Sequence, residues 1–376
     1  MGAAGELTCD SLAKGDFLET FEAPARDRRY DGLQWGRAIA ALMVALVHAS
    51  IYPFPSSGIT HLLSRFAVTL FFVISGYLMV VTTGERAFDG VRFLKKRLLR
   101  VAPLYYVATL LAAVAVLIAP QGFKDTVFDV PHLVMSLLFL PMYEPGHSGA
   151  IDPFLRLGWT LNYEMYFYVI FALLCRFGQM NRAILMTALF CATTLLGQMF
   201  KFENAMLQFY TRVDPLAFMG GVWLAVLCKR FKGRLAATPS LLLLVVAMLA
   251  LAGIHQVYGG VRDIVWTQIA IDAICTLVIA VLALTAALPG GVLHRGFMAA
   301  GDASYSMYLF HMFAVGAAHL AFSRLLPHLD RSIAVVLTCA AAVAAGLAAY
   351  WLIERPLQAL VRPLGDQRNK TQPQTA

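Results

Sequence analysis

Two ionisable residues that could perform acid–base chemistry lie in long apolar stretches of this sequence, where charged groups are unfavourable. His48 lies in the run 36–54, eleven residues after Arg37, and Glu164 lies in the run 159–177. An ionisable group in hydrocarbon costs a few kcal/mol on insertion scales, so its presence suggests a function. In membrane-spanning helices, His48 would lie about 16 Å and Glu164 about 20 Å above the inner face. A carboxylate beside an imidazole holds its tautomer and supports its charged form, so we predict that His48 and Glu164 form a catalytic pair.

Simpler interpretations of the same residues remain open at this point. A lone histidine in a membrane span is more often a packed, hydrogen-bonded helix partner, and Glu164 could serve as a polar bond between helices. Asp272 is also expected at mid-membrane and could belong to the same polar cavity, although a structural role is favoured for it. For Asp214, which follows Arg212 at the outer end of a span, a simple ion pair is the favoured interpretation.

The most basic stretch of the chain is RFLKKRLLR, residues 92–100. Arg97 and Arg100 are i,i+3 neighbours on one helix face at the mouth of an apolar run. Two guanidinium groups there suit a phosphate-bearing ligand that docks from the cytosol. For Arg92, Lys95 and Lys96, anchoring of the topology is the better explanation.

Composition restricts the class of protein. The chain has 376 residues, of which 59% are hydrophobic and only 14% charged, with a mean hydropathy of +0.68. Soluble domains carry roughly 25% charged residues, which excludes an ordinary cytosolic enzyme. The net charge of +8 is therefore attributed to cytosolic loops of a membrane protein and not to a nucleic-acid partner. The six cysteines are scattered without CxxC spacing, so neither a disulfide framework nor a metal site is expected.

The apolar runs predict an all-α, polytopic integral membrane protein with about ten transmembrane helices. An eleventh run, 130–143, is short and flanked by Pro131 and Pro141, which favours a re-entrant or interfacial segment. The ten runs are 36–54, 66–83, 101–120, 159–177, 183–200, 213–228, 237–258, 264–288, 303–323 and 332–353.

The distribution of basic residues predicts the orientation. If the N-terminus is cytosolic and 130–143 does not cross, most of the 30 Lys and Arg residues fall on the inner face, as the positive-inside rule requires. We therefore expect both termini in the cytosol. Residues 1–34 carry acidic residues before any apolar run, unlike a cleavable signal. The expected organisation is a polar tail over 1–34, a membrane domain over 35–360 and a second polar tail over 361–376.

Six motifs in a fixed order resemble the membrane-bound acyltransferase 3 family, most closely its exopolysaccharide acetyltransferase branch. The resemblance covers residues from about 30 to 360. The motifs are LQWGRAIAALMVALVHAS (33–50, with R-x10-H), FFVISGYLM (71–79), RFLKKRLLRVAPLYY (92–106), GWTLNYEMYFY (158–168), ASYSMYLFH (303–311) and IERP (353–356).

The resemblance implies an enzyme of a bacterial inner membrane that takes an acyl group from cytosolic acyl-CoA, a donor substrate and not a permanently bound cofactor. The acyl group, expected to be acetyl, would pass to a hydroxyl of an exported or envelope polysaccharide. By motif position, His48 would be catalytic. The residues implied in substrate binding are Arg37, Ser75, Tyr77, Arg97, Arg100 and Trp159, where Trp159 and Glu164 form the W-x4-E pattern and the two arginines entering the third span hold the CoA phosphates.

Two mechanisms and two further classes of function stay open. The histidine either deprotonates the sugar hydroxyl for direct attack on the thioester, which we favour, or forms a covalent acyl-histidine. A saccharide or small-anion transporter would fit the composition, but it would predict an internal repeat, and the R-x10-H and W-x4-E patterns occur once each. A non-catalytic scaffold would leave the buried charges unexplained. No Walker loop, HExxH or GxSxG motif is present in the sequence.

Overall fold

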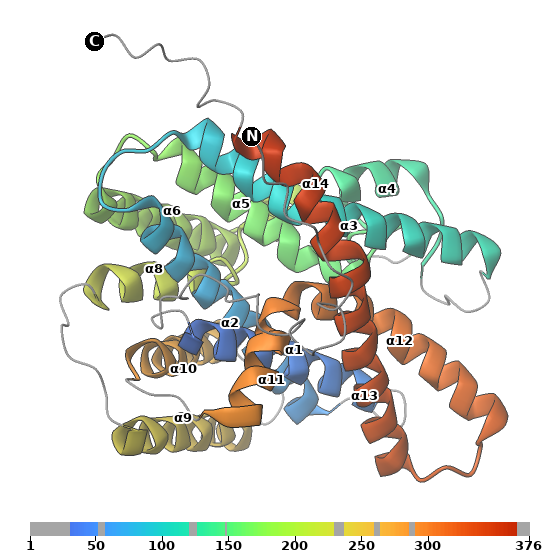
Figure 1. Ribbon diagram of the computed structural model, residues 1–376. Coiled ribbons are helices and arrows are strands. Elements are labelled where there is room, and N and C mark those ends of the chain that lie inside the picture. The colour runs from blue at the N-terminus through green and yellow to red at the C-terminus, as the bar shows by residue number, and fades with distance from the viewer. Residues whose placement is uncertain are drawn as a thin grey trace, which may run out of the picture.

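The computed structural model describes residues 31–51, 57–119, 126–146, 149–228, 237–258, 264–285 and 290–366. All regular elements within these ranges are helices, which confirms the all-α class. Figure 1 shows them packed around α1 and α2. The longer helices are α1 (Asp31–Ile51), α2 (Gly58–Thr83), α3 (Gly90–Ile118), α5 (Trp159–Leu173), α6 (Gln179–Met199), α8 (Leu216–Cys228), α9 (Ala237–Tyr258), α10 (Ile264–Leu284), α11 (Gly291–Asp302), α12 (Ser304–Leu325), α13 (Arg331–Ala349) and α14 (Arg355–Asp366).

Each of the ten predicted apolar runs coincides with one of these helices, but a count of ten crossings is not established. Among the described residues, six helices are long and apolar enough to cross a membrane, as a polytopic integral membrane protein requires. α5 has 15 residues and α8 has 13, so each is only about 20 Å long, against about 30 Å of hydrocarbon. The six helices are Asp31–Ile51, Gly58–Thr83, Gly90–Ile118, Gln179–Met199, Val265–Leu284 and Arg331–Val361.

Two glycines allow α2 and α8 to pack backbone against backbone. A Cβ atom on Gly221 of α8 would lie 1.8 Å from the carbonyl oxygen of Val73, and one on Gly76 of α2 would lie 2.1 Å from that of Phe218. No side chain fits into either space. Such close approach is typical of helix pairs in membranes, where packing replaces the hydrophobic driving force. The contact fixes the position of α2, which carries the SGY motif (residues 75–77 of FFVISGYLM).

The apolar run 130–143 does not form a crossing helix. Its only helix is α4 (Val130–Leu137), eight residues long and capped by the Asp129 side chain. The chain then turns at Phe139, whose φ of 58° is uncommon for a bulky residue. The Phe139 ring packs against Tyr105 of α3, with ring centroids 4.9 Å apart. The segment therefore turns back after meeting the middle of α3.

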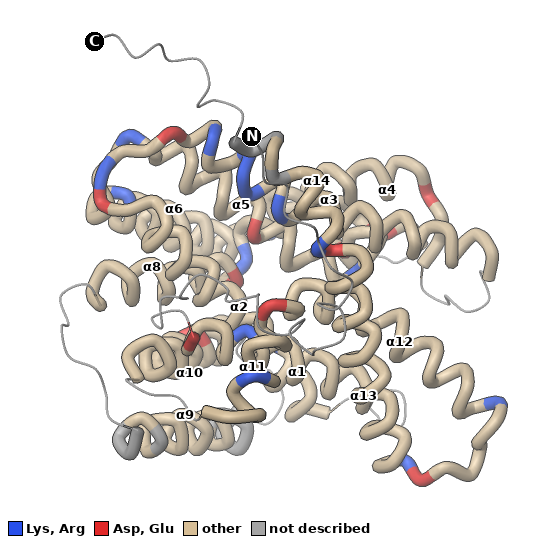
Figure 2. Tube along the Cα trace, in the orientation of Figure 1, with Lys and Arg blue, Asp and Glu red and all other residues tan. Residues whose placement is uncertain are grey.

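The C-terminal helices place the carboxylate of Glu354 in the interior of the bundle. α13 ends in a π-helical segment, η6 (Tyr350–Glu354), and α14 then lies alongside α3 (Figure 1). π-Helical turns are rare and frequently mark functional sites. Figure 2 shows basic residues around α3, α14 and the start of α6, whereas α12 and α13 are uncharged except near their ends.

Candidate active site

A cavity of about 100 Å³ lies between α1, α2, α3, α5 and α12. Its lining includes three arginines and one carboxylate, contributed by helices far apart in the sequence. The four charged residues that were predicted to belong to the site therefore line the same cavity. They are Arg37 of α1, Arg97 and Arg100 of α3, and Glu164 of α5.

The arginines of α3 enter the cavity as their i,i+3 spacing predicted, and Arg97 is held in place. Its Nη2 atom donates a hydrogen bond to Thr82 Oγ1 at 3.0 Å. Its guanidinium group also lies 5.5 Å from the ring centroid of Phe93 and 5.8 Å from that of Tyr168. Cation–π contacts of this kind fix the plane of an arginine without neutralising its charge. Arg97 is thus oriented and keeps its charge for a ligand.

Glu164 belongs to a compact polar group that α2 and α5 contribute to the cavity. Its Oε1 atom accepts a hydrogen bond from Ser75 Oγ at 2.8 Å and another from the Tyr168 hydroxyl. It also acts electrostatically on Arg37 and Arg97. Glu164 is therefore an anchor for Ser75 and shares the cavity with the three arginines.

A second carboxylate, Glu354, was not among the predicted site residues. It is 5% exposed, accepts hydrogen bonds from Ser306 Oγ and from Gln358 Nε2, the latter at 2.8 Å, and acts electrostatically on Arg37. The π-helical turn of η6 ends at this residue. The signal that could have found it is the IERP motif.

His48 lies outside the set of residues that line the cavity. Its Nδ1 atom is 2.9 Å from the carbonyl oxygen of Val44, and since a carbonyl can only accept, Nδ1 carries the hydrogen. That leaves Nε2 with a free lone pair, the form a general base needs. The ring packs against a second histidine, His311 of α12, with centroids 4.9 Å apart.

The predicted contact between His48 and Glu164 is not made, and the reason is where α5 begins. Gly158, just before α5, lies against the ring of Tyr105, as a Cβ there would be 2.6 Å from the tyrosine oxygen. Tyr105 is only five residues beyond Arg100, about 8 Å along α3. α5 thus starts inside the bundle, beside α3, and Glu164 lines the cavity with the arginines while His48 does not.

Two other predicted binding residues do not line the cavity. Trp159 packs edge-on against Phe72, with ring centroids 6.4 Å apart, and Tyr77 packs against the hydrophobic core of the bundle. Ser75 does line the cavity. Of the SGY and W-x4-E motifs, the structure therefore brings Ser75 and Glu164 to the site.

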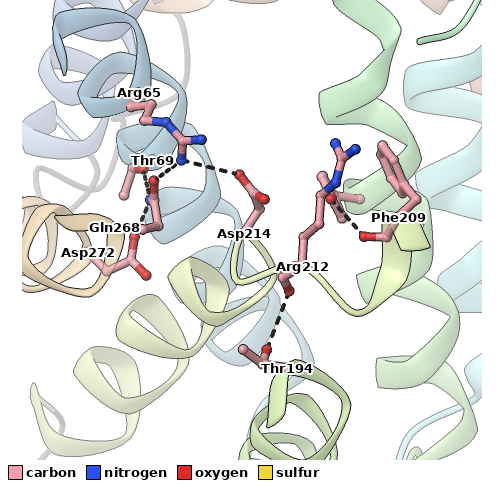
Figure 3. A network of polar contacts seen from close by, with 9 residues as sticks. Arg65, Thr69, Thr194, Phe209, Arg212, Asp214, Gln268 and Asp272 are labelled. Atoms are coloured by element: carbon pink, nitrogen blue, oxygen red, sulfur yellow. Dashed lines mark hydrogen bonds and ion pairs between the residues drawn. The ribbon is translucent and has the colours of Figure 1, made fainter. Parts of the chain in front are cut away.

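Asp272 and Asp214 belong to a separate polar network between α2, α10 and the start of α8 (Figure 3). Gln268 Nε2 donates to Asp272 Oδ1 at 2.8 Å, and Arg65 Nη1 donates to Gln268 Oε1 at 2.6 Å. Arg65 also forms an ion pair with Asp214 at 4.0 Å. Neither aspartate lines the cavity, which agrees with the structural roles favoured for both.

Comparisons with known proteins relate most of the chain to one family. The model of the acyltransferase 3 family, described as an acyltransferase domain, matches residues 30–351. The chain is 33% identical over 304 residues to the exopolysaccharide production protein ExoZ of Rhizobium meliloti (strain 1021), a match that covers 77% of this chain and 88% of that protein. No solved structure gives a significant match.

Proposed function

The chain belongs to the acyltransferase 3 family, and on that premise we propose that it transfers an acetyl group from cytosolic acetyl-CoA to a hydroxyl of an exported or envelope polysaccharide. The observation that carries the proposal is the convergence of Arg37, Arg97 and Arg100 on one cavity beside α1, the helix that also bears His48. A glycan acceptor is inferred from the name of the relative, an exopolysaccharide production protein.

The arginines would hold the phosphates of the donor. Guanidinium groups bind phosphate oxygens through charge-assisted, often bidentate, hydrogen bonds. The cavity of about 100 Å³ has room for several water-sized groups, which suits a narrow pantetheine arm. We therefore place the nucleotide at the inner surface and the thioester arm in the cavity.

His48 would act on the acceptor. Arg37 and His48 are eleven residues apart on α1, about 16 Å along the helix, a span that an extended pantetheine arm can bridge. The free Nε2 lone pair of His48 would take the proton of the sugar hydroxyl as its oxygen attacks the thioester carbonyl. Glu164 would keep Ser75 and Arg97 in place around the donor, instead of supporting the imidazole.

We propose that the protein lies in the inner membrane of a bacterium, with the donor site facing the cytosol. The basic surroundings of α3 and α14 (Figure 2) support that side as the cytosolic one. We therefore propose that both termini are cytosolic and that the lipid bilayer surrounds the domain.

Thiol release from acetyl-CoA by the purified, detergent-solubilised protein, with and without a polysaccharide acceptor, tests the proposal. Acceptor-dependent release is expected from the wild type. His48→Ala should abolish it and still bind acetyl-CoA, since removal of an ionisable group from a span relieves an insertion penalty. Acceptor-independent labelling of His48 by radioactive acetyl-CoA would favour the acyl-histidine route over direct transfer. A folded wild-type protein that moves saccharide across vesicles and releases no thiol would be a transporter instead.

A further inference from the structure

One hydroxyl group at the cavity, that of Ser304, differs from its neighbours. Six side chains that line the cavity carry a hydroxyl group. The hydroxyl of Ser304 has no hydrogen-bond partner among the residues that the structure describes. The five hydroxyl groups that are bonded to other groups of the protein belong to Ser75, Thr160, Tyr168, Tyr305 and Tyr308.

The burial of Ser304 gives the missing partner its weight. The residue begins α12 and is 0% exposed. Buried polar groups are nearly always satisfied in native proteins, and each exception calls for an explanation. Because Ser304 lines the cavity, a ligand that enters the cavity is the partner that would satisfy its hydroxyl.

The nearest part of α1 supplies a positive charge. Ala38 and Ala303, the chain neighbours of Arg37 and Ser304, belong to one hydrophobic cluster between α1, α11 and α12. Arg37 and Ser304 therefore line adjoining parts of the cavity. A guanidinium group and a hydroxyl group can both donate hydrogen bonds, and such donors together suit the oxygens of an anion.

We propose that Ser304 is a substrate-binding residue whose hydroxyl group donates a hydrogen bond to the phosphate that is attached to the pantetheine arm of acetyl-CoA. The inference rests on the proposed function. Of the donor's phosphates, this one is next to the arm, so it enters the cavity furthest and is the one that a fully buried hydroxyl can reach. Arg37 lies about 16 Å along α1 from His48, which a pantetheine arm can bridge, so the same phosphate falls beside Arg37 and Ser304.

The assignment divides the phosphates of the donor between two helices. Arg100 of α3 also lines the cavity, but it is exposed, whereas Ser304 is buried. An exposed arginine suits the phosphates on the nucleotide side, which stay near the inner surface. The donor is therefore held at two levels, and Ser304 belongs to the deeper one.

Three donors, shortened from the nucleotide end, locate the contact of Ser304. Acetyl-CoA, acetyl-4′-phosphopantetheine and S-acetylpantetheine share the thioester arm, but the second keeps only the phosphate in question and the third has no phosphate. Thiol release by the purified full-length protein gives kcat/KM for each. Ser304→Ala should lower kcat/KM for the first two donors by about 10- to 100-fold, the effect of one hydrogen bond to a charged group. It should leave kcat/KM for S-acetylpantetheine unchanged.

Two other serines of α12 provide the controls. Ser323 is exposed and does not line the cavity, so Ser323→Ala should behave as the wild type with all three donors. Ser306 donates a hydrogen bond to Glu354, so Ser306→Ala should lower the Tm of the unliganded protein in detergent. Ser304→Ala should leave that Tm unchanged or slightly higher, because it removes a buried hydroxyl that lacks a partner in the described structure.

The outcomes separate the possible roles of Ser304. Wild-type kcat/KM of Ser304→Ala with acetyl-CoA overturns the proposal. Equal losses with all three donors, or a lower Tm of the unliganded variant, would show a structural role and also overturn it. A loss with acetyl-CoA alone would place the hydroxyl at the nucleotide and refute the assignment to this phosphate. Absence of thiol release from the wild type with every donor would instead refute the proposed function itself.

Discussion

At the scale of single residues, the arginines of α3 differ from the neighbouring basic residues in the side of the helix from which they project. Arg97 and Arg100 line the cavity, whereas Lys95, on the same helix, is exposed and does not. All three side chains carry a positive charge. Only the two arginines lie on the helix face that lines the cavity, so only they are placed to bind a ligand there.

Substitution of either cavity arginine is therefore expected to weaken donor binding. Arg97→Ala or Arg100→Ala should raise KM for acetyl-CoA by roughly 10- to 100-fold, which corresponds to loss of about 1.5–3 kcal/mol from charge-assisted phosphate contacts. KM for the acceptor should change much less. Initial rates of thiol release at varied acetyl-CoA check this. Lys95→Ala is the control, and an equal effect from Lys95→Ala would mean that the stretch is only a topology signal.

The contact between Glu164 and Ser75 makes a second prediction. Glu164→Gln removes a negative charge from a cavity with three arginines, so acetyl-CoA binding should be retained or become tighter, while kcat falls as the alignment of the wall is lost. Because the two side chains share one hydrogen bond, Glu164→Gln and Ser75→Ala should be non-additive in kcat by about 0.5–3 kcal/mol. A double-mutant cycle measures this term. Strict additivity would show that the 2.8 Å contact does not affect turnover.

At the scale of elements, the glycine contact between α2 and α8 should tolerate no side chain. Gly221→Ala would place a methyl group 1.8 Å from the Val73 carbonyl oxygen and force the helices apart. We expect destabilisation of about 1–3 kcal/mol or more, seen as a lower Tm in detergent and as reduced thiol release.

Gly253→Ala provides the control for this prediction. Gly253 lies in α9 and a Cβ there would meet nothing within 4 Å, so alanine should be neutral or stabilising by about 0.4–1 kcal/mol. Equal loss of stability from both substitutions would attribute the effect to the helices in general and not to the close contact.

The elements also explain how far the site could be predicted. Apolar runs identified the helices, and i,i+3 spacing identified the face of α3 that carries Arg97 and Arg100. The expected contact of Glu164 with His48 is not made, because every run was assumed to begin at a membrane boundary. α5 begins instead against Tyr105, a tertiary contact that no periodicity encodes. His311 and Glu354 lie far along the chain from the other site residues, so their spacing in the sequence does not link them to the site. Only the motifs that contain them, ASYSMYLFH and IERP, indicate a role.

At the scale of the whole molecule, the orientation can be tested by reporters. A reporter in the outer segment 121–157 should read outside, and one in the basic loop 229–234 should read cytosolic. Three of the predicted apolar runs, which form α5, α6 and α8, separate these two positions in the sequence, and the positive-inside rule sets their sides. Impermeant thiol labelling of introduced cysteines in intact cells measures the sides. Labels on the same side at both positions would contradict three crossings and with them the proposed arrangement.

The backbone contact of α2 and α8 also restricts how the cavity can be enlarged. Ser75 and its neighbours on α2 form one wall, and that wall cannot retreat because its helix already touches the main chain of α8. If the proposed function holds, space for an acyl group larger than acetyl is gained by shortening side chains on the other walls of the cavity, such as Leu161 of α5 and Tyr308 of α12. Libraries that aim at new donor chain lengths are best directed to those positions, with Gly76 and Gly221 held constant.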